Sequence, residues 1–204
     1  MAMKLYYYPG ACSLAPHIAL REANLEFELE RVDLATKQTA SGAPFAAVNP
    51  KGQVPALALE SDAVLTEVPA ILQYVADRAP RTRLAPSAGT IDRYRLQEWL
   101  NFVTAELHKG LGALFRPDVP DAWRKVVLDT VGARLGYLDR HLKGGQYLMN
   151  GTFTVADSYA FTILNWASYV RIELAPWPAV QGYLERIAAR PSVRQAMRAE
   201  GLIG

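Results

Sequence analysis

The feature that most constrains the fold is the stretch Val-Asn-Pro-Lys-Gly-Gln-Val-Pro-Ala-Leu at residues 48–57. Its Asn-Pro and Lys-Gly pairs form turns, so the first half is expected to be a loop. In the second half Val54-Pro55 precedes an apolar alternation, which predicts the start of a strand, where a proline need not donate to the sheet. If the Val54-Pro55 bond is cis, the Val54 N–H and C=O face outward and pair with an extended peptide. The alternative is an ordinary proline-containing turn.

The composition is that of an ordinary globular protein, because 50% of the 204 residues are hydrophobic and 21% are charged. No apolar run is long enough to span a membrane and the N-terminus lacks the apolar core of a signal peptide, so we expect a cytoplasmic protein without a membrane partner. The net charge of +2 gives no indication of a nucleic-acid partner. The single cysteine, Cys12, excludes an internal disulfide framework and a cysteine-rich zinc site, and no metal is expected.

The first 80 residues carry strand and helix patterns in the order β-α-β, loop, β-β-α. The predicted strands are residues 4–8, 27–32, 56–59 and 63–66, with a turn at Ser61-Asp62, and the predicted helices are 13–24 and 68–78. Residues 81–89 contain proline and glycine and no apolar face, which is typical of a linker. The sequence therefore predicts an α+β domain over residues 1–80.

Residues 90–204 carry only helical patterns, which predict a second, all-α domain. The predicted helices are residues 90–115, 121–143, 154–171, 178–189 and 192–200. The helix at 154 begins with Thr-Val-Ala-Asp, which resembles a capping box with aspartate in place of the usual glutamate or glutamine. We therefore expect Asp157 to have a role in folding rather than in chemistry.

Several motifs together resemble one known family. They are Tyr-Tyr-Tyr-Pro-Gly-Ala-Cys-Ser-Leu-Ala-Pro-His at 6–17, Asn-Pro-Lys-Gly-Gln-Val-Pro at 49–55, Leu-Thr-Glu at 65–67, Glu-Trp-Leu-Asn at 98–101 and Glu-Leu-His-Lys-Gly at 106–110. Each is weak alone, but together they are similar to the cytosolic glutathione transferases and, more narrowly, to the bacterial Beta class. The resemblance implies a thioredoxin-like domain followed by an all-α domain, glutathione as co-substrate, a small hydrophobic electrophile as second substrate, and a homodimer with its site at the subunit boundary.

Cys12 is the first candidate catalytic residue. It lies between a predicted strand and the first turn of a helix, where the helix dipole and free N–H groups are expected to lower the pKa of a thiol below about 8.5. The alternative is a buried, inert cysteine. Because the chain has no second cysteine, thioredoxin-type disulfide cycling is not expected. The resemblance implies that Cys12 lies near the glutathione sulfur and forms a mixed disulfide with it.

Glutathione is an extended anionic tripeptide with a free amine, so its recognition needs a strand edge, an acid and N–H donors. Val54, next to Pro55, supplies the strand edge, Glu67 pairs with the γ-glutamyl ammonium, and the Val68 N–H at a helix N-terminus binds the neighbouring carboxylate. Glu67 has the alternative role of complementing the helix dipole. The family usually has glycine or serine at the position of Val68, so the hydroxyl that a serine would offer to the ligand is lost in this chain. The resemblance assigns Lys37 to the glycine carboxylate, and the alternative is a solvated lysine.

A second candidate catalytic residue is His108. Asn101, Ala105 and His108 lie four and three residues apart and so share one helix face, and Lys109 follows. The resemblance implies that this face closes the glutathione site, with His108 near the sulfur. A neutral imidazole there accepts the thiol proton, and an imidazolium stabilises the thiolate. The alternative is a structural histidine, which is how we interpret His17.

The resemblance also implies an electrophile pocket lined by Tyr8, Pro9, Leu111 and Phe115, for which the alternative is packing in the core. Two other functions remain open beside conjugation. One is glutathione-dependent thiol–disulfide or peroxide chemistry through Cys12, and the other is a non-catalytic binding module, since a fold does not determine a function. The presence of Cys12 together with Val54, Glu67 and His108 argues against the binding module.

Overall fold

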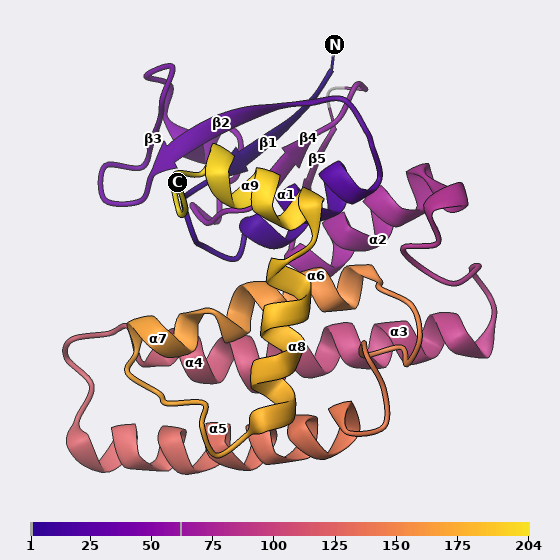
Figure 1. Ribbon diagram of the computed structural model, residues 1–204. Helices are drawn as coiled ribbons and strands as arrows, with labels where there is room; N and C mark the ends of the chain where they lie inside the picture. The colour runs from indigo at the N-terminus through magenta and orange to yellow at the C-terminus, as the bar shows by residue number, and fades with distance from the viewer. Residues whose placement is uncertain (1, 62) are drawn as a thin grey trace. The chain divides into compact units, whose positions relative to one another are not determined.

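The computed structural model describes residues 2–61 and 63–204 (Figure 1). The chain divides into two compact units, of which one comprises Met1–Ala85 with Arg190–Gly204 and the other Pro86–Ala189. The predicted helical domain, 90–204, therefore differs from the observed second unit, because the last helix belongs with the first unit. A helical pattern predicts that a helix forms and says nothing about which neighbour it packs against.

The first unit is built on a five-stranded mixed sheet with the order β3-β2-β1-β4-β5 (Figure 1). Strands β1 and β2 are parallel, as expected for strands joined through a helix, and the other pairs are antiparallel. In the central register Leu5 is paired with Leu29 on one side and with Leu57 on the other. The strands are β1 (Met3–Tyr7), β2 (Phe27–Asp33), β3 (Gln38–Thr39), β4 (Ala56–Ala58) and β5 (Val64–Thr66).

All four predicted strands are confirmed, and the two-residue strand β3 lies in a segment that was expected to be a loop. A strand of two polar residues has too few positions to show an alternation. Of the predicted turn at Ser61-Asp62, Asp62 lies outside the described residues.

Three helices complete the first unit: α1 (Leu14–Glu22), α2 (Val68–Arg78) and α9 (Pro191–Ala199). Helix α1 contacts both α2 and α9. Its Leu14, Ile18 and Leu20 are buried, so α1 forms the centre of the helical layer. Short 3₁₀ turns lie at η1 (Phe45–Ala47) and η2 (Pro80–Thr82).

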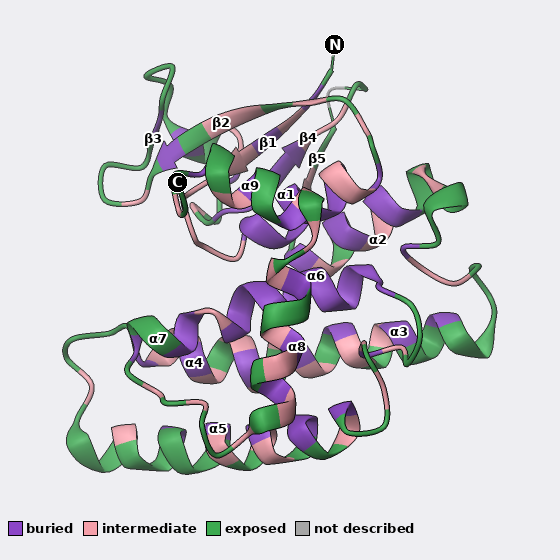
Figure 2. Ribbon diagram, viewed as in Figure 1, coloured by how far each residue is buried: buried purple, intermediate pink, exposed green. Residues whose placement is uncertain are grey.

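The named elements of the second unit are all helical, apart from isolated β-bridges between residues 147 and 152, and α6 is its central helix. Every residue of α6 (Val155–Leu164) is buried, which is the pattern of a helix that is covered on all sides (Figure 2). The other elements are α3 (Ile91–Phe102), the π-helical turn η3 (Val103–His108), α4 (Lys109–Ala113), α5 (Asp121–Leu142), α7 (Trp166–Tyr169) and α8 (Pro178–Ala188).

Two helices of this unit differ from the prediction in detail. The helix expected over residues 90–115 changes from α to π geometry at η3, and the helix expected over 154–171 is interrupted at Asn165. Apolar periodicity places a helix but does not report such a local change in hydrogen bonding. The predicted role of Asp157 is confirmed, because its Oδ2 accepts the Thr154 N–H at 2.8 Å in a capping box at the start of α6.

Candidate active site

The loop between β1 and α1 presents Cys12. The Ala11 N–H donates to the Tyr8 carbonyl at 3.0 Å. The Ser13 hydroxyl donates to that carbonyl and accepts the Tyr8 N–H, each at 3.2 Å. Gly10 has a φ of 71°, which glycine adopts without the steric cost of a Cβ. These bonds close the turn and place Cys12 two residues before the start of α1.

The structure brings Cys12 and Val54 together across 42 residues. The Cys12 thiol donates to the Val54 carbonyl with an Sγ–O distance of 3.3 Å. The Val54-Pro55 bond is cis, as predicted. The Val54 carbonyl therefore already accepts one hydrogen bond, from the thiol. Among the described residues the Val54 N–H has no hydrogen-bond partner.

The expected low pKa of the Cys12 thiol is also wrong. Although the residue as a whole is half-buried, the pKa of its thiol is raised to about 12, mainly by burial of the sulfur, and the negative charge of Glu67 contributes in the same direction. Backbone N–H groups of Cys12 and Ser13 act in the opposite direction and do not outweigh burial. The helix N-terminus is therefore present, but desolvation is the larger effect. In this structure Cys12 is a neutral thiol at pH 7.

Two charged side chains border the loop at residues 48–57. Glu67 is the residue before α2, and its carboxylate forms an ion pair with the Lys51 ammonium. The Glu67 side chain is 68% exposed. Lys37 donates through Nζ to the Gly52 carbonyl at 3.1 Å. Lys51 was not predicted as a site residue, although it lies in the stretch that most constrained the fold, because the sequence does not show that the loop folds back to the start of α2.

The backbone of Val68 is at the N-terminus of α2, while its side chain is 4% exposed. Val68 therefore offers its N–H and no side-chain surface to a ligand. Cys12, Val54, Glu67 and Lys37 all lie around the same loop or bond to it, so the first unit brings these four predicted site residues together.

In the second unit His108 ends the π-helical turn η3. Its Nδ1 lies 2.7 Å from the Tyr159 hydroxyl, and its ring centroid lies 5.0 Å from that of Trp166. Tyr159 is fully buried, so it holds the imidazole from inside the unit. Tyr159 was not predicted, because its position on a predominantly apolar helix indicates only a core residue. Insertions of π geometry are frequent at functional sites.

The remaining predicted residues of the second unit differ in exposure. Asn101, Ala105 and Lys109 are exposed. Phe115 is 50% exposed, and its ring lies edge-on to Trp166 at 5.4 Å. Leu111 is fully buried, so we correct its assignment to the electrophile pocket, since its side chain offers no surface to a ligand.

Neither a metal site nor a membrane span is found in the part of the chain that the structure describes. No group of three or more His, Cys, Asp or Glu residues in residues 2–61 and 63–204 has the geometry to hold a metal ion. No helix among these residues is long and apolar enough to cross a bilayer.

Comparison with known proteins decides the family. Residues 1–77 match the model of the glutathione S-transferase N-terminal domain, and residues 102–191 match that of the C-terminal domain. The chain belongs to the glutathione S-transferase family. This glutathione transferase is 46% identical to glutathione S-transferase GstA of Escherichia coli O157:H7 over 200 residues, which are 98% of this chain and 100% of the relative.

Solved structures agree with the assignment of this chain to the glutathione S-transferase family. The bacterial beta class glutathione S-transferase of Sphingomonas chungbukensis is 46% identical, with a TM-score of 0.94 over 98% of this chain and 100% of that one. A sphingomonad glutathione S-transferase complexed with glutathione is 47% identical, with the same TM-score and coverage. The predicted fold, family and Beta-class resemblance are confirmed, and glutathione is the co-substrate.

The raised pKa of Cys12 predicts how the free transferase reacts with an alkylating agent. We expect iodoacetamide to modify Cys12 at a rate that still rises between pH 9 and pH 10, because only the thiolate reacts and its pKa is about 12. An ordinary thiol, with a pKa of about 8.5, is mostly ionised by pH 9.5. Intact-protein mass spectrometry measures the rate, and circular dichroism checks that the fold persists. A plateau below pH 9 would show that the helix dipole prevails over burial.

Proposed function

We propose that this glutathione transferase conjugates glutathione to small hydrophobic electrophiles, acting as a cytoplasmic homodimer. The observation that supports the proposal best is the grouping of Cys12, Val54, Glu67 and Lys37 around one loop. Together they provide a backbone edge, a carboxylate and an ammonium group, which match the backbone, the amine and a carboxylate of an extended tripeptide.

The backbone of Val54 is the proposed partner of the cysteinyl residue of glutathione. Its N–H has no partner among the described residues, and its carbonyl has a second lone pair beside the Cys12 thiol. Pairing along an exposed backbone edge gives affinity without side-chain specificity. This arrangement puts the sulfur of glutathione next to Cys12.

Glu67 is the proposed partner of the γ-glutamyl ammonium. The carboxylate holds a primary ammonium, that of Lys51. The glutathione ammonium has the same charge and donors, so it replaces Lys51 on binding. The Val68 N–H, at the N-terminus of α2, then donates to the neighbouring carboxylate of the ligand. Lys37, which donates to the Gly52 carbonyl of the same loop, is the proposed partner of the glycine carboxylate.

Because the glutathione ammonium is proposed to replace that of Lys51 on the Glu67 carboxylate, Glu67→Gln tests the function directly. We expect the variant to lose at least ten-fold in glutathione affinity, since charged hydrogen bonds contribute roughly 1.5–3 kcal/mol and ten-fold corresponds to about 1.4 kcal/mol. Isothermal calorimetry measures the affinity. Unchanged affinity would mean that Glu67 only complements the helix dipole.

A matched control separates the two ammonium groups. Lys51→Met breaks the same ion pair but leaves the carboxylate available, so its glutathione affinity is expected to equal or exceed that of the wild type. If Lys51→Met weakens binding as much as Glu67→Gln does, Lys51 binds the ligand itself, and the exchange of ammonium groups is refuted.

His108 is the proposed acid–base group. When its Nδ1–H donates to the Tyr159 hydroxyl, Nε2 carries the lone pair that accepts the glutathione proton. The charge formed on the ring then stabilises the thiolate. Asn101, Ala105 and Lys109 share its exposed helix surface and are the proposed contacts of this unit with glutathione. Tyr8, Pro9 and Phe115 are the proposed lining for the hydrophobic electrophile.

The proposed homodimer has a candidate surface on the second unit. A cavity of about 720 Å³ lies along α3 and α5 and is lined by the aromatic residues Trp99, Phe102 and Tyr137. Aromatic residues and arginine are enriched at protein interfaces. The cavity lining also includes both members of the ion pair between Glu106 and Arg134, so it offers both signs of charge to a second copy.

A second function, glutathione-dependent redox chemistry, is supported by the contact of the Cys12 thiol with Val54. A glutathione sulfur bound along Val54 lies within reach of that thiol and can form a mixed disulfide with it. Since Cys12 is the single cysteine of the chain, only glutathione itself can resolve this disulfide.

A further inference from the structure

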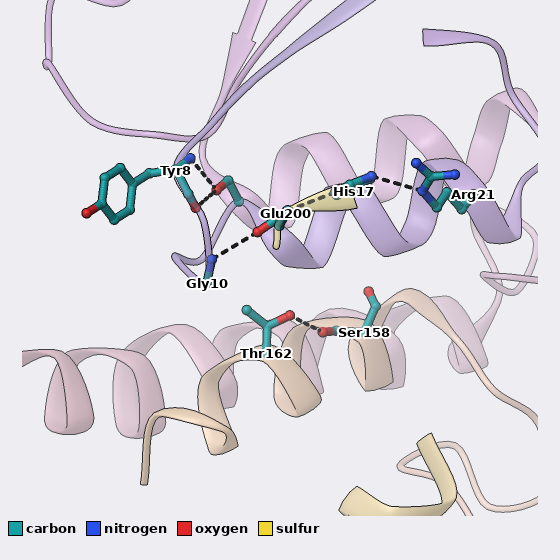
Figure 3. Close-up of polar contacts among 8 residues, drawn as sticks. Tyr8, Gly10, His17, Arg21, Ser158, Thr162 and Glu200 are labelled. Atoms are coloured by element: carbon teal, nitrogen blue, oxygen red, sulfur yellow. Dashed lines mark hydrogen bonds and ion pairs between the residues drawn. The ribbon is translucent and has the colours of Figure 1, made fainter. Parts of the chain in front are cut away.

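The C-terminal segment reaches the loop that carries Cys12. After α9 the chain places Glu200 in the interior of the first unit, with 5% of the residue exposed. Glu200 Oε2 accepts the Gly10 N–H at 2.9 Å, and Oε1 lies 2.8 Å from His17 Nδ1 (Figure 3). A single carboxylate thus joins the Cys12 loop, helix α1 and the end of the chain, which are up to 190 residues apart in sequence.

The position of the protons in this cluster follows from Arg21. Its Nε donates to His17 Nε2 at 2.9 Å (Figure 3). A guanidinium stays protonated in proteins and has no acceptor, so His17 Nε2 must accept, and the ring proton must lie on Nδ1. His17 is therefore a neutral imidazole that donates to an ionised Glu200. Both oxygens of the buried carboxylate are satisfied, which is the condition for burying such a group.

The C-terminal segment also places the Leu202 side chain beside the loop that carries Cys12. A Cβ placed on Gly10 would lie 3.4 Å from a methyl carbon of Leu202. The loop therefore meets the C-terminal segment through a charge-assisted hydrogen bond from Gly10, and the Leu202 side chain lies beside Gly10. Gly10 is two residues from Cys12, and Ala11 between them is bonded back to Tyr8, so a shift of Gly10 moves Cys12.

We propose that Glu200 is a positioning residue, which holds the Cys12 sulfur at the Val54 carbonyl through the Gly10 N–H. The proposal rests on the proposed function, because it concerns the same sulfur site. It gives the C-terminal segment a part in the chemistry, beyond the packing of α9. The role depends on the carboxylate, because glutamine has one acceptor oxygen for the two donors, and its amide group faces the other donor.

The test compares two substitutions of the same kind in the same contact between α1 and the C-terminal segment. Glu200→Gln removes the bond to the loop. Glu22→Gln is the control. Glu22 on α1 accepts hydrogen bonds from Arg190 Nε, at 2.7 Å, and from the Ser192 hydroxyl, so it also fastens the C-terminal segment to α1. Neither of these bonds involves the loop that carries Cys12. Both variants are expected to melt at a lower temperature than the wild type.

Only Glu200→Gln is expected to alter the chemistry. In the reaction with oxidised glutathione, the Cys12 sulfur attacks the disulfide bond of the ligand. A new S–S bond forms between Cys12 and one glutathione while the S–S bond of oxidised glutathione breaks. The other glutathione leaves as a thiol that carries the proton from Cys12. We expect this rate, measured by intact-protein mass spectrometry at 10 °C, to fall at least ten-fold in Glu200→Gln and to stay within two-fold in Glu22→Gln. The glutathione dissociation constant of both variants should stay within three-fold of the wild type.

Equal rates in the two variants would overturn the proposal and leave Glu200 a structural residue. If Glu200→Gln does not fold, Leu202→Ala serves instead, because it removes the side chain that lies beside Gly10 and buries no unpaired polar group. Its rate is expected to fall about three-fold, and an unchanged rate overturns the proposal. If wild-type protein binds no glutathione, the proposed function fails first, which distinguishes the two failures.

Discussion

Replacing Cys12 with alanine is expected to abolish mixed-disulfide formation with oxidised glutathione and to keep conjugation of a model aryl halide within about ten-fold of the wild-type rate. A ten-fold loss corresponds to about 1.4 kcal/mol of transition-state stabilisation. The first effect is complete because the chain has no other cysteine to form the disulfide. The two activities are thereby separated by one substitution.

The structure explains why conjugation should survive. The Cys12 thiol is neutral, with a pKa raised to about 12 by burial, and it donates to the Val54 carbonyl. It is therefore a hydrogen-bond donor that shapes the site, while the thiolate of glutathione attacks the electrophile. If Cys12 were the group that attacks the electrophile in place of glutathione, it would instead need a lowered pKa.

Cys12→Ser is the matched control, because a hydroxyl can still donate to the Val54 carbonyl but cannot form a disulfide. We expect its conjugation rate to lie closer to wild type than that of Cys12→Ala. Initial rates with the aryl halide and mass spectrometry after exposure to oxidised glutathione give both readouts, and calorimetry confirms that glutathione binds. If either variant loses conjugation while it still binds glutathione, the thiol takes part in the reaction and this division of roles is wrong.

Most of the fold follows from local patterns. Apart from the two-residue strand β3, the strands and helices of the first unit were predictable, because alternation, helical periodicity and turn residues act over a few positions. The position of α9 was not, since its pattern fits any apolar neighbour. The π-helical turn η3 was not predictable either, because the change lies in backbone hydrogen bonding and leaves the apolar spacing of the helix intact.

The residues of the candidate site were likewise predictable where the signal is local and unpredictable where it depends on the whole fold. Motifs identified Cys12, Val54 and Glu67, and the structure places all three around one loop. The ionisation of Cys12 was wrongly predicted because the helix N-terminus is local and visible in the sequence, whereas burial depends on the whole fold. Glu200 gave no signal, because its partners are far away in the chain.

Asp157→Asn is expected to destabilise the protein by about 3 kcal/mol at pH 7.5. The fully buried carboxylate accepts the Leu148 N–H and the Thr154 N–H, each at 2.8 Å, as well as the Thr154 hydroxyl and the Tyr183 hydroxyl, each at 3.0 Å. Asparagine has the same shape, but its NH₂ group replaces one acceptor oxygen and faces donors. At least two donors lose their acceptor, and each buried unsatisfied donor costs roughly 1–3 kcal/mol.

The pH dependence gives this prediction a second readout. Burial raises the pKa of Asp157 to about 6, against the opposing effect of its hydrogen-bond donors. The unfolded chain has a lower pKa at this position, so between about pH 6 and pH 4 the folded wild type binds the extra proton and gains stability as the pH falls. Asparagine does not titrate. The difference in unfolding free energy between wild type and Asp157→Asn should therefore widen by about 1.4 kcal/mol per pH unit in that window.

Urea unfolding at pH 7.5 and pH 5.0 measures both effects. Asp129→Asn is the control, because its carboxylate is 68% exposed and pairs with Lys125 on the surface of α5. Exposed pairs of this kind contribute about 0–1 kcal/mol, so this variant should follow the wild type at both pH values. A loss below about 1 kcal/mol in Asp157→Asn would show that the four donors find other acceptors. A gap that narrows at pH 5.0 would show that those donors, rather than burial, set the ionisation of this carboxyl group.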